Sequence, residues 1–238
     1  MQIDIQQLSM TYPSGKQALK GLDLALKSPS LIGLLGPNGA GKSTLMKLLV
    51  AALEPTGGAI LVNGQPLRKN ERMLKEQLGY LPQDFGLFDE LTVRQFLDYM
   101  AALKGLRRSK AAIDKVIGMV GLQEKSKAKI RTLSGGQRQR TAAARAIITD
   151  PALVLADEPT GALDSRTGRE VLGFLKKLNR EGDTVVLITH DNSIAVKADR
   201  IIRLQDGKII YDGDAHDPRA VVQPGEAGEE DEEQEVGA

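Results

Sequence analysis

Nine consecutive residues, 36–44, have the composition and spacing of a loop that binds phosphate groups. They read Gly-Pro-Asn-Gly-Ala-Gly-Lys-Ser-Thr, with the defining positions at Gly36, Gly41, Lys42 and Ser43. Glycines let the backbone turn its N–H groups inward around an anion, and a helix that starts there adds partial positive charge. In such loops the lysine reaches the β- and γ-phosphates, and the following hydroxyl binds Mg²⁺. The spacing therefore predicts a site for a nucleoside triphosphate and Mg²⁺.

The residues on either side of this loop predict the setting that it needs. Residues 31–35 form an apolar run typical of a buried strand, and residues 44–52 are apolar at helical spacing. A strand, a glycine-rich loop and a helix in this order are the context in which the motif binds phosphate. The alternative is a chance glycine-rich turn, which average residue usage produces in about one chain in a hundred of this length.

Two carboxylates follow a second apolar run. Residues 153–156 predict a buried strand, and Asp157 and Glu158 come directly after it. In P-loop proteins such an aspartate binds Mg²⁺ from the side opposite the loop serine, and the adjacent carboxylate can polarise an attacking water. By itself the pair could be a solvated strand end. Together with the loop at 36–44 it favours hydrolysis of the triphosphate.

A further helix start has the features of an anion site. Residues 133–137 read Leu-Ser-Gly-Gly-Gln, and a helix is predicted from there to about Ile148. Ser134 is a favourable N-cap residue, and Gly135 and Gly136 leave N–H groups open to an anion. The alternative is an ordinary capped helix with a flexible entry. A second phosphate-binding helix start in the same chain makes the anion site the favoured interpretation.

The composition is that of an ordinary globular protein of 238 residues, with 41% hydrophobic and 26% charged residues. No apolar run approaches the length of about 18 residues that a membrane-spanning helix requires, and the first residues are mixed in character. We therefore expect neither a transmembrane helix nor a signal peptide. Cysteine is absent, which excludes disulfides and cysteine metal sites and is consistent with a reducing cytosol.

The net charge of +1 hides an asymmetry between the body of the chain and its end. Residues 224–238 contain seven acidic residues and no basic ones, so without them the net charge of +1 becomes +8. This acidic tail has almost no apolar residues and is expected to be disordered. The basic balance of residues 1–223 favours an anionic surface such as the inner leaflet of a membrane or a nucleic acid, and a mixed solvated surface is the simpler alternative.

Alternating strand and helix patterns predict an α/β fold with a P-loop core and a mostly parallel sheet. Apolar residues alternate at Ile3 and Ile5 and again at 22–26, which predicts an antiparallel β region at the N-terminus. Further short strands are expected at 59–62 before an Asn63-Gly64 turn, at 78–81, at 184–188 and in a hairpin at 201–211.

Two helical patterns interrupt this alternation between about residues 87 and 140. The apolar positions of the first are Val93, Phe96, Leu97, Met100 and Leu103, and those of the second are Ile113, Val116, Ile117 and Val120. The segment from Gly105 to Ser109 separates the two helices. We therefore expect a helical subdomain inserted into one α/β domain that spans residues 1–223, with the acidic tail after it.

The loop at 36–44, the Leu-Ser-Gly-Gly-Gln segment and the strand that ends in Asp157 and Glu158, in this order, resemble the ATP-binding subunits of ABC transporters. The resemblance covers Met1 to about Gly213 and implies an ATPase that uses ATP and Mg²⁺. Ser43 and Asp157 would bind the metal. The loop residues that the resemblance assigns to the nucleotide are Gly36, Pro37, Asn38, Gly39, Ala40, Gly41, Lys42, Ser43 and Thr44.

Shorter motifs extend the resemblance. Tyr12 matches the family's aromatic residue that stacks on adenine, and Gln83 matches the glutamine that approaches Mg²⁺ and connects the core with the helical insert. Asp164 lies in a Gly-Ala-Leu-Asp segment that resembles the family's loop across the dimer interface, where it would bind nucleotide. His190, which follows a strand ending at Thr189, matches the switch histidine. An edge tyrosine and a structural histidine are the simpler alternatives.

The resemblance also implies a mechanism that needs two chains facing head to tail, each completing the ATP site of the other. Glu158 would activate water and His190 would hold the γ-phosphate, with Lys42 and Gln83 completing the catalytic set. The residues supplied by the facing copy are Ser134, Gly135, Gly136 and Gln137. Closure on ATP and opening after hydrolysis would move a membrane-spanning permease. The expected partners are a second ATP-binding subunit, as a homodimer, and a permease, at the cytoplasmic face of the inner membrane.

Different parts of the chain resemble different branches of the family. Residues 31–43, 79–88 and 91–105 are similar to subunits of multidrug and antibiotic export systems, whereas residues 156–165 and 188–191 are similar to the macrolide-export and lipoprotein-release group. Export through a separate membrane protein is the predicted function. Lipoprotein release, or ATP-dependent regulation of a membrane protein, is the alternative. The short span between the two phosphate motifs disfavours a DNA-repair ATPase, and the single P-loop disfavours a two-domain translation factor, so no nucleic-acid partner is expected.

Overall fold

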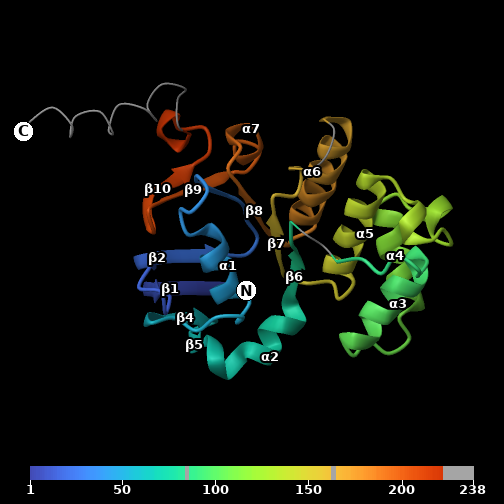
Figure 1. The fold of residues 1–238 in the computed structure, drawn as a ribbon, viewed down its shortest axis with the longest axis horizontal. Helices are drawn as coiled ribbons and strands as arrows, with labels where there is room; N and C mark the ends of the chain where they lie inside the picture. Colours follow the sequence, from blue (N-terminus) through green and yellow to red (C-terminus); the bar gives the residue numbers. More distant parts are fainter. Residues whose placement is uncertain (84–85, 162–164, 222–238) are drawn as a thin grey trace, which may run out of the picture.

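The computed structural model describes residues 1–83, 86–161 and 165–221, and Figure 1 shows their arrangement. These residues form two β-sheets and a group of helices on one side. The predicted acidic tail lies outside the described residues. None of the helices in the described ranges is long and apolar enough to cross a membrane.

The N-terminal part of the chain forms an antiparallel sheet in the order β2-β1-β4-β5. Its strands are β1 (Gln2–Thr11), β2 (Gln17–Lys27), β4 (Gly57–Val62) and β5 (Gln65–Pro66). Alternate residues of β1, including Ile3 and Ile5, are buried, which confirms the predicted antiparallel region. Asn63 and Gly64 both have positive φ, 50° and 76°, as the two-residue turn of a hairpin requires.

The second sheet is the parallel core, in the order β10-β9-β3-β8-β7-β6. Its strands are β3 (Leu31–Leu35), β6 (Leu78–Leu81), β7 (Leu153–Asp157), β8 (Thr184–Thr189), β9 (Arg200–Gln205) and β10 (Lys208–Asp214). Only β10 runs antiparallel to its neighbour. Every residue of β3 and β8 is buried because structure covers both faces of the sheet, so these strands read as continuous apolar runs.

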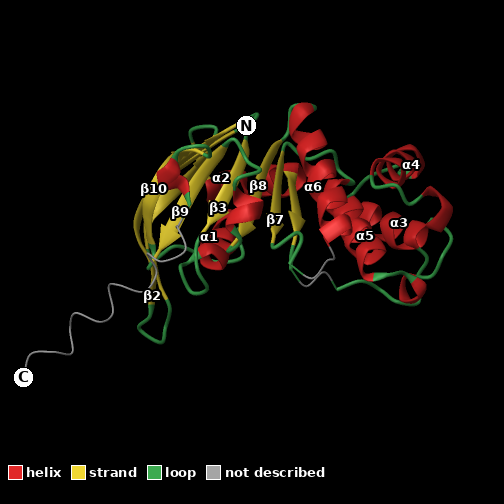
Figure 2. Cartoon of the chain, turned by 90° about the horizontal axis from the view of Figure 1, so that it is seen from above, coloured by secondary structure: helices red, strands yellow, loops and turns green. Residues whose placement is uncertain are grey.

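Helices cover the two faces of the parallel sheet in separate apolar layers. One face, with Leu153 and Leu155 of β7, packs with α1 (Lys42–Leu49) and the antiparallel sheet. The opposite face, with Val154 and Ala156, packs with α5 (Gly135–Ile147) and α6 (Ser165–Arg180). Figure 2 shows α5 and α6 between the sheet and the two helices of the insert. The helices that complete the described structure are α2 (Leu67–Gln77) and α7 (Asn192–Ala195).

The predicted helical insert consists of α3 (Val93–Leu103) and α4 (Lys110–Met119). Thr92 and Gln95 form a capping box at the start of α3, in which the Thr92 side chain accepts from the Gln95 N–H and the Gln95 side chain accepts from the Thr92 N–H. Phe96 is fully buried against the same layer as α5. Leu103, expected on the buried face, is instead 65% exposed. At about 100° per residue it lies at the margin of the buried stripe, next to the exposed Tyr99.

Two predicted element limits also differ from the structure. The first helix ends at Leu49, since Ala51 takes a positive φ of 56° and leads the chain away from the helix axis. The strand expected from Ala59 begins earlier, at Gly57, because it pairs there with Ser9 of β1. Helix α2 has no clear signal in the sequence, since only Leu74 of its residues is buried.

Candidate active site

The ends of four parallel strands bring the predicted site residues to one edge of the sheet. The chain leaves β3 into the loop at 36–44, β6 toward Gln83, β7 at Asp157 and β8 toward His190. The register pairs Leu35 with Thr189, Asp157 with Ile188, and Leu81 with Ala156. Because the carboxyl ends of parallel strands meet at one edge, the phosphate loop, both carboxylates, Gln83 and His190 gather there.

The phosphate loop depends on glycine where its backbone meets the rest of the fold. A Cβ at Gly36 would lie 2.2 Å from the Leu204 carbonyl oxygen, so no other residue fits without moving β9. Gly41 has a φ of 109° and precedes the first residue of α1, so it turns the chain into the helix. The first amides of α1 have no intrahelical acceptor and are available to an anion.

Lys42 is 8% exposed and lies against the loop that it follows. Its Nζ donates to the Gly36 carbonyl oxygen and to the Pro37 carbonyl oxygen, the second at 3.0 Å. Burial lowers the pKa of Lys42, while the negative charges of Glu158 and Asp157 oppose this shift. The ammonium group is therefore held beside the loop, close enough to the two carboxylates for their negative charges to affect its pKa.

A pocket of about 170 Å³ lies beside the loop, and all the residues that line it come from positions 12–44. The Tyr12 hydroxyl lies 3.1 Å from Thr44 Oγ1, at hydrogen-bond distance, so the ring is tied to the first turn of α1. The remaining lining residues are Lys16, Ala18, Pro37, Asn38, Gly39, Gly41, Lys42 and Ser43. The structure therefore brings Tyr12 together with the loop, as the sequence predicted.

Asp157 ends β7 at the same edge as Lys42. Burial raises the pKa of Asp157, the neighbouring Glu158 carboxylate raises it further, and the Lys42 charge opposes both. Two half-buried carboxylates side by side favour a cation, and the candidate donors of Ser43, Asp157 and Gln83 are all oxygens, which suit Mg²⁺. Among the described residues no group of three or more histidines and carboxylates could hold a metal ion by itself.

Glu158 follows Asp157 with an unusual backbone and a fully engaged side chain. Its φ is 44°, and its N–H still donates to the Ile188 carbonyl oxygen at 2.8 Å, so the ladder with β8 continues to this residue. Thr189 Oγ1 donates to Oε2 at 3.1 Å, and the His190 N–H donates to Oε1 at 3.0 Å. The side chain is 12% exposed.

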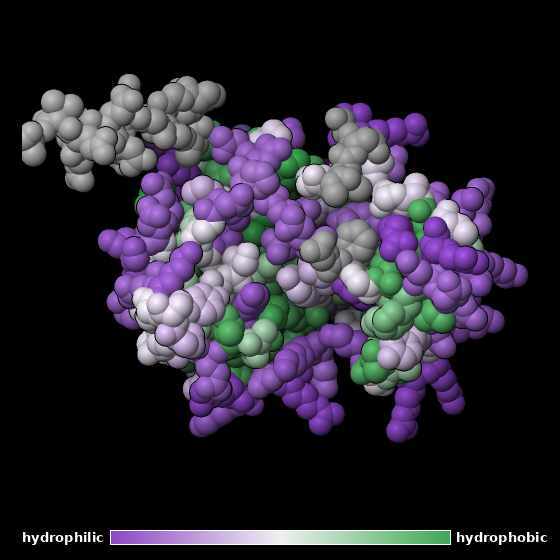
Figure 3. Space-filling model, viewed as in Figure 1, coloured by the Kyte–Doolittle hydropathy of each residue, from purple (hydrophilic) through white to green (hydrophobic). Residues whose placement is uncertain are grey.

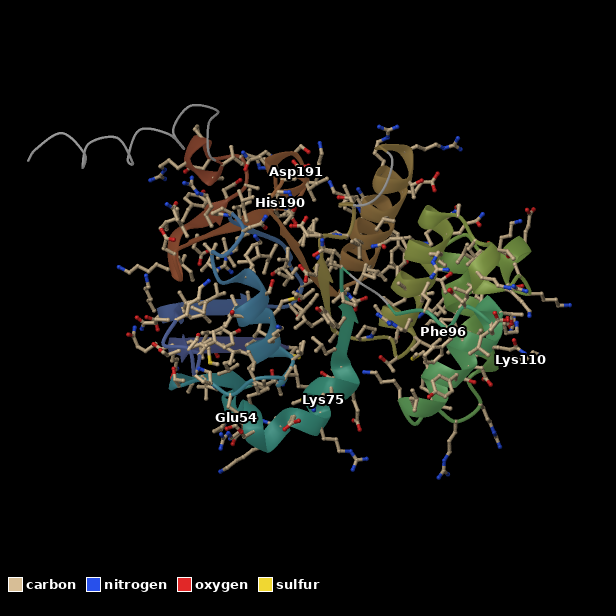
Figure 4. The ribbon with its side chains drawn as sticks, in the orientation of Figure 1. Glu54, Lys75, Phe96, Lys110, His190 and Asp191 are labelled. Atoms are coloured by element: carbon tan, nitrogen blue, oxygen red, sulfur yellow. The ribbon has the colours of Figure 1, made fainter. Side chains whose placement is uncertain are left out.

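His190 lies at the carboxyl end of β8, beside Asp191 (Figure 4). Its Nδ1 is 2.7 Å from Glu158 Oε1, and its side chain is 57% exposed. The predicted histidine and the predicted base are therefore in direct contact, with the histidine on the solvent side. This arrangement lets the imidazole reach an incoming group while the carboxylate stays at the sheet edge.

The helix start at 134–137 forms a capping box. Ser134 Oγ accepts from the Gln137 N–H at 3.3 Å, and Gln137 Oε1 accepts from the Ser134 N–H at 3.1 Å, which confirms Ser134 as the N-cap. The two glycines have different surroundings. A Cβ at Gly135 would meet nothing within 4 Å, whereas one at Gly136 would lie 2.3 Å from Thr167 Cγ2. Gly135 therefore presents an open backbone, and Gly136 lets α5 pack closely on α6.

Two of the predicted residues receive less structural support. Gln83 is exposed and follows β6 by two residues, so it lies at the correct edge, and the residues after it are outside the described ranges. Asp164 itself lies outside the described residues. The roles of both stay predictions.

Sequence reasoning missed two residues that the structure brings to this site. Gln139 is 4% exposed, and its Nε2 donates to the Pro159 carbonyl oxygen at 3.0 Å, which joins the helix start at 134–137 to the loop after Glu158. Its signal was a polar residue on the buried, alanine-rich side of α5. Thr189, 1% exposed, contacts Glu158 and gives no signal, because threonine is ordinary in a strand.

Comparisons with known proteins agree with this geometry. The sequence profile of the family described as "ABC transporter" matches residues 19–161. The chain is 36% identical over 233 residues to a macrolide export ATP-binding/permease protein of Photorhabdus laumondii, covering 93% of this chain and 36% of that protein. It is 41% identical over 214 residues to an uncharacterized ABC transporter ATP-binding protein of Bacillus subtilis, covering 84% of this chain and 83% of that protein. The chain thus spans about a third of the macrolide-export relatives and most of the second relative.

Solved structures show the same fold. One is cbiO1 from Clostridium perfringens, part of an ABC transporter complex, with a TM-score of 0.83, 29% identity, and coverage of 90% of this chain and 88% of that one. Another is the ATP-binding cassette MJ0796, a dimer in a post-hydrolysis state with ADP and phosphate bound. Its TM-score is 0.79 at 31% identity, over 90% of this chain and 98% of that one.

Proposed function

The chain belongs to the ATP-binding proteins of ABC transporters and is an ATPase, and from this we propose that it drives export of a substrate through a separate membrane-spanning permease. In this proposal two copies close around ATP and reopen after hydrolysis. One observation carries it: among the described residues, the loop pocket is lined by positions between 12 and 44, while the capped helix start at 134–137 presents open backbone elsewhere on the same chain. Each chain therefore supplies two separate parts of a phosphate site.

In this proposal the phosphate loop at 36–44 and the residues around it bind Mg²⁺-ATP. The amides at the start of α1 receive the phosphates, and Lys42 exchanges its bonds with the Gly36 and Pro37 carbonyl oxygens for bonds with the β- and γ-phosphates. Tyr12, held beside the loop, packs on the adenine. Ser43, Asp157 and Gln83 would hold Mg²⁺, which would neutralise charge on the phosphates.

A second copy completes the site. The pocket of about 170 Å³ beside the loop is smaller than the range of about 300–1,000 Å³ in which proteins usually enclose small ligands. The facing copy supplies Ser134, Gly135 and Gly136, and the amides of the two glycines close over the γ-phosphate. In the same proposal Gln137 orients Ser134 through the capping box, and Asp164 approaches the nucleotide across the interface. The dimeric state of MJ0796 supports a pair of this kind.

Hydrolysis in this proposal uses the residues at the end of β7 and β8. Glu158 accepts a proton from the attacking water, and the His190 imidazole donates a hydrogen bond to the γ-phosphate. The loop after β8 positions His190. In the structure the carboxylate and the imidazole are 2.7 Å apart, and in this proposal the imidazole leaves the carboxylate to reach the phosphate. The bond that breaks is the one between the γ-phosphorus and the bridging oxygen, and ADP and phosphate leave.

The helical insert offers a surface for the membrane partner. Phe88 and Tyr99 are each 46% exposed and their rings meet edge to face at 5.5 Å, next to the exposed Leu103. Figure 3 shows hydrophobic side chains gathered over this part of the insert. Exposed apolar surface of this kind favours a protein partner. We place the chain at the cytoplasmic face of the inner membrane, attached through this surface to a permease.

The direction of transport and the partner follow from resemblance. Several relatives are macrolide export proteins, which favours export here. Release of lipoproteins or regulation of a membrane protein is the second candidate, because residues 156–165 are similar to a group that includes lipoprotein-release proteins.

Co-purification from membranes decides between these functions and a soluble role. A bound protein with six or more spans supports transport, and a soluble partner alone contradicts it.

The shared site is tested by mixing two inactive chains. Lys42→Ala removes the phosphate lysine, and Ser134→Arg blocks the facing helix start. A mixed dimer keeps one intact site, formed by the loop of the Ser134→Arg chain and the helix start of the Lys42→Ala chain. Recovery of ATPase activity on mixing is expected. No recovery at concentrations where mixed dimers form would contradict the two-chain site.

A further inference from the structure

We propose that Thr189 is a positioning residue that holds the carboxylate of Glu158 for hydrolysis. The proposal rests on the proposed function, since it takes Glu158 as the group that activates water. Thr189 is the last residue of β8 and is 1% exposed. Its Oγ1 donates to Glu158 Oε2 at 3.1 Å.

The direction of this hydrogen bond is determined by a second one. The Asp191 N–H donates to Thr189 Oγ1 at 3.0 Å, so the hydroxyl oxygen already acts as an acceptor on that side. A hydroxyl has one proton, and the carboxylate is an acceptor only. The Thr189 proton therefore points at Glu158 Oε2, which is a charge-assisted hydrogen bond of the stronger kind.

The backbone of Thr189 cannot move independently of the phosphate loop. Thr189 pairs with Leu35, the last residue of β3, and its carbonyl oxygen accepts from the Gly36 N–H at 3.3 Å. One residue thus connects the first glycine of the loop with the carboxylate that would activate water. This connection through Thr189 sets the spacing between the phosphate loop and the Glu158 carboxylate.

The histidine cannot perform the same task. The His190 side chain is 57% exposed, and in the proposed cycle its imidazole leaves Glu158 Oε1 to contact the γ-phosphate. At that moment the carboxylate keeps its bonds to the His190 N–H and to the Thr189 hydroxyl. A positive φ of 44° at Glu158 is unfavourable for a residue with a Cβ, so the side chain depends on such contacts for its orientation.

Thr189→Val tests this role, because valine has the same shape and suits a buried strand. We expect kcat to fall about 10- to 100-fold, the effect of losing one hydrogen bond to a charged group. The KM for ATP and ATP-driven dimerisation should stay within about two-fold, because Thr189 is not among the residues that line the loop pocket. Thr189→Ser keeps the hydroxyl and should recover most of kcat. A Thr189→Val protein with kcat within two-fold of the unmodified protein overturns the proposal.

Two controls separate positioning from general damage. Thr189→Val also leaves the Asp191 N–H without its acceptor, so Asp191→Ala, which removes the cap of α7, disturbs the same loop without touching Glu158. Its kcat should fall less than that of Thr189→Val, and an equal fall contradicts the proposal. In a Glu158→Ala background, Thr189→Val should change the residual rate by less than about two-fold, because its effect passes through the carboxylate. If Glu158→Ala alone leaves the rate unchanged, the proposed role of Glu158 as the base fails, and that result is distinct from a failure of Thr189.

Discussion

The two glycines at the start of α5 should respond in opposite ways to the same substitution. In Gly136→Ala the added methyl would lie 2.3 Å from Thr167 Cγ2, where ordinary contacts are 3.4–4 Å. Relief of this contact requires the Thr167 side chain to change rotamer or the ends of α5 and α6 to separate, a strain of the overpacking kind that costs about 1–3 kcal/mol. For a domain of this size each kcal/mol lowers the Tm by about 2–4 °C.

Gly135→Ala is the matched control, because the same methyl group meets nothing within 4 Å. Alanine is favoured over glycine in a helix by up to about 1 kcal/mol, so this variant should be as stable as the unmodified protein or more so. Its ATPase rate should nevertheless fall at least about ten-fold, equal to about 1.4 kcal/mol, if the facing copy presents this backbone to the γ-phosphate.

Thermal unfolding and steady-state hydrolysis separate the two effects. Gly136→Ala should melt several degrees lower, and Thr167→Ser, which removes the clashing methyl, should restore part of the loss. The reasoning is refuted if Gly136→Ala melts at the temperature of the unmodified protein, or if Gly135→Ala is the less stable of the two. A Gly135→Ala protein with full ATPase activity would leave the packing argument intact but contradict the proposed phosphate contact.

Three other predictions concern catalysis, charge and packing. Glu158→Gln should slow hydrolysis about 10²- to 10⁴-fold while ATP binding, followed by fluorescence of a labelled nucleotide, persists; hydrolysis at the unmodified rate would exclude Glu158 as the base. Burial and neighbouring carboxylates raise the pKa of Asp183, so its negative charge destabilises the fold as pH rises through that pKa. Asp183→Asn should therefore raise the Tm at pH 7, and the gain should vanish toward pH 4; a gain that is equal at both pH values contradicts this. Phe96→Ala should cost about 3–5 kcal/mol because Phe96 is fully buried, whereas Phe88→Ala, 46% exposed, should cost much less and weaken binding to the permease; equal Tm losses would contradict the packing.

The central strands and the site residues at their ends could be predicted, for a physical reason. Strands such as β3 and β8 are buried on both faces and must be apolar throughout, so their signal is contained in a few adjacent residues. The phosphate loop is equally local, because its glycines, lysine and serine are neighbours in the chain. The edge at which Asp157, Glu158 and His190 meet then follows from the rule that parallel strands end on the same side.

Elements whose signal is not local were missed or misplaced. Helix α2 buries only Leu74, so its apolar pattern is too sparse to recognise. Leu103 has the spacing of a buried residue, yet it lies at the margin of the buried stripe of α3 and is 65% exposed. The start of β4 at Gly57 depends on pairing with Ser9, which is distant in sequence.

By itself the sequence determined the chemistry of this protein: a phosphate loop, two carboxylates, a histidine and a capped helix start, each coded by adjacent residues. Only the tertiary structure decided which of these groups touch. It places Thr189 and His190 on Glu158, separates the roles of Gly135 and Gly136, and lines the loop pocket with residues from positions 12–44. The reason is that contacts between strands and helices depend on register and packing over the whole domain, which no short stretch of sequence contains.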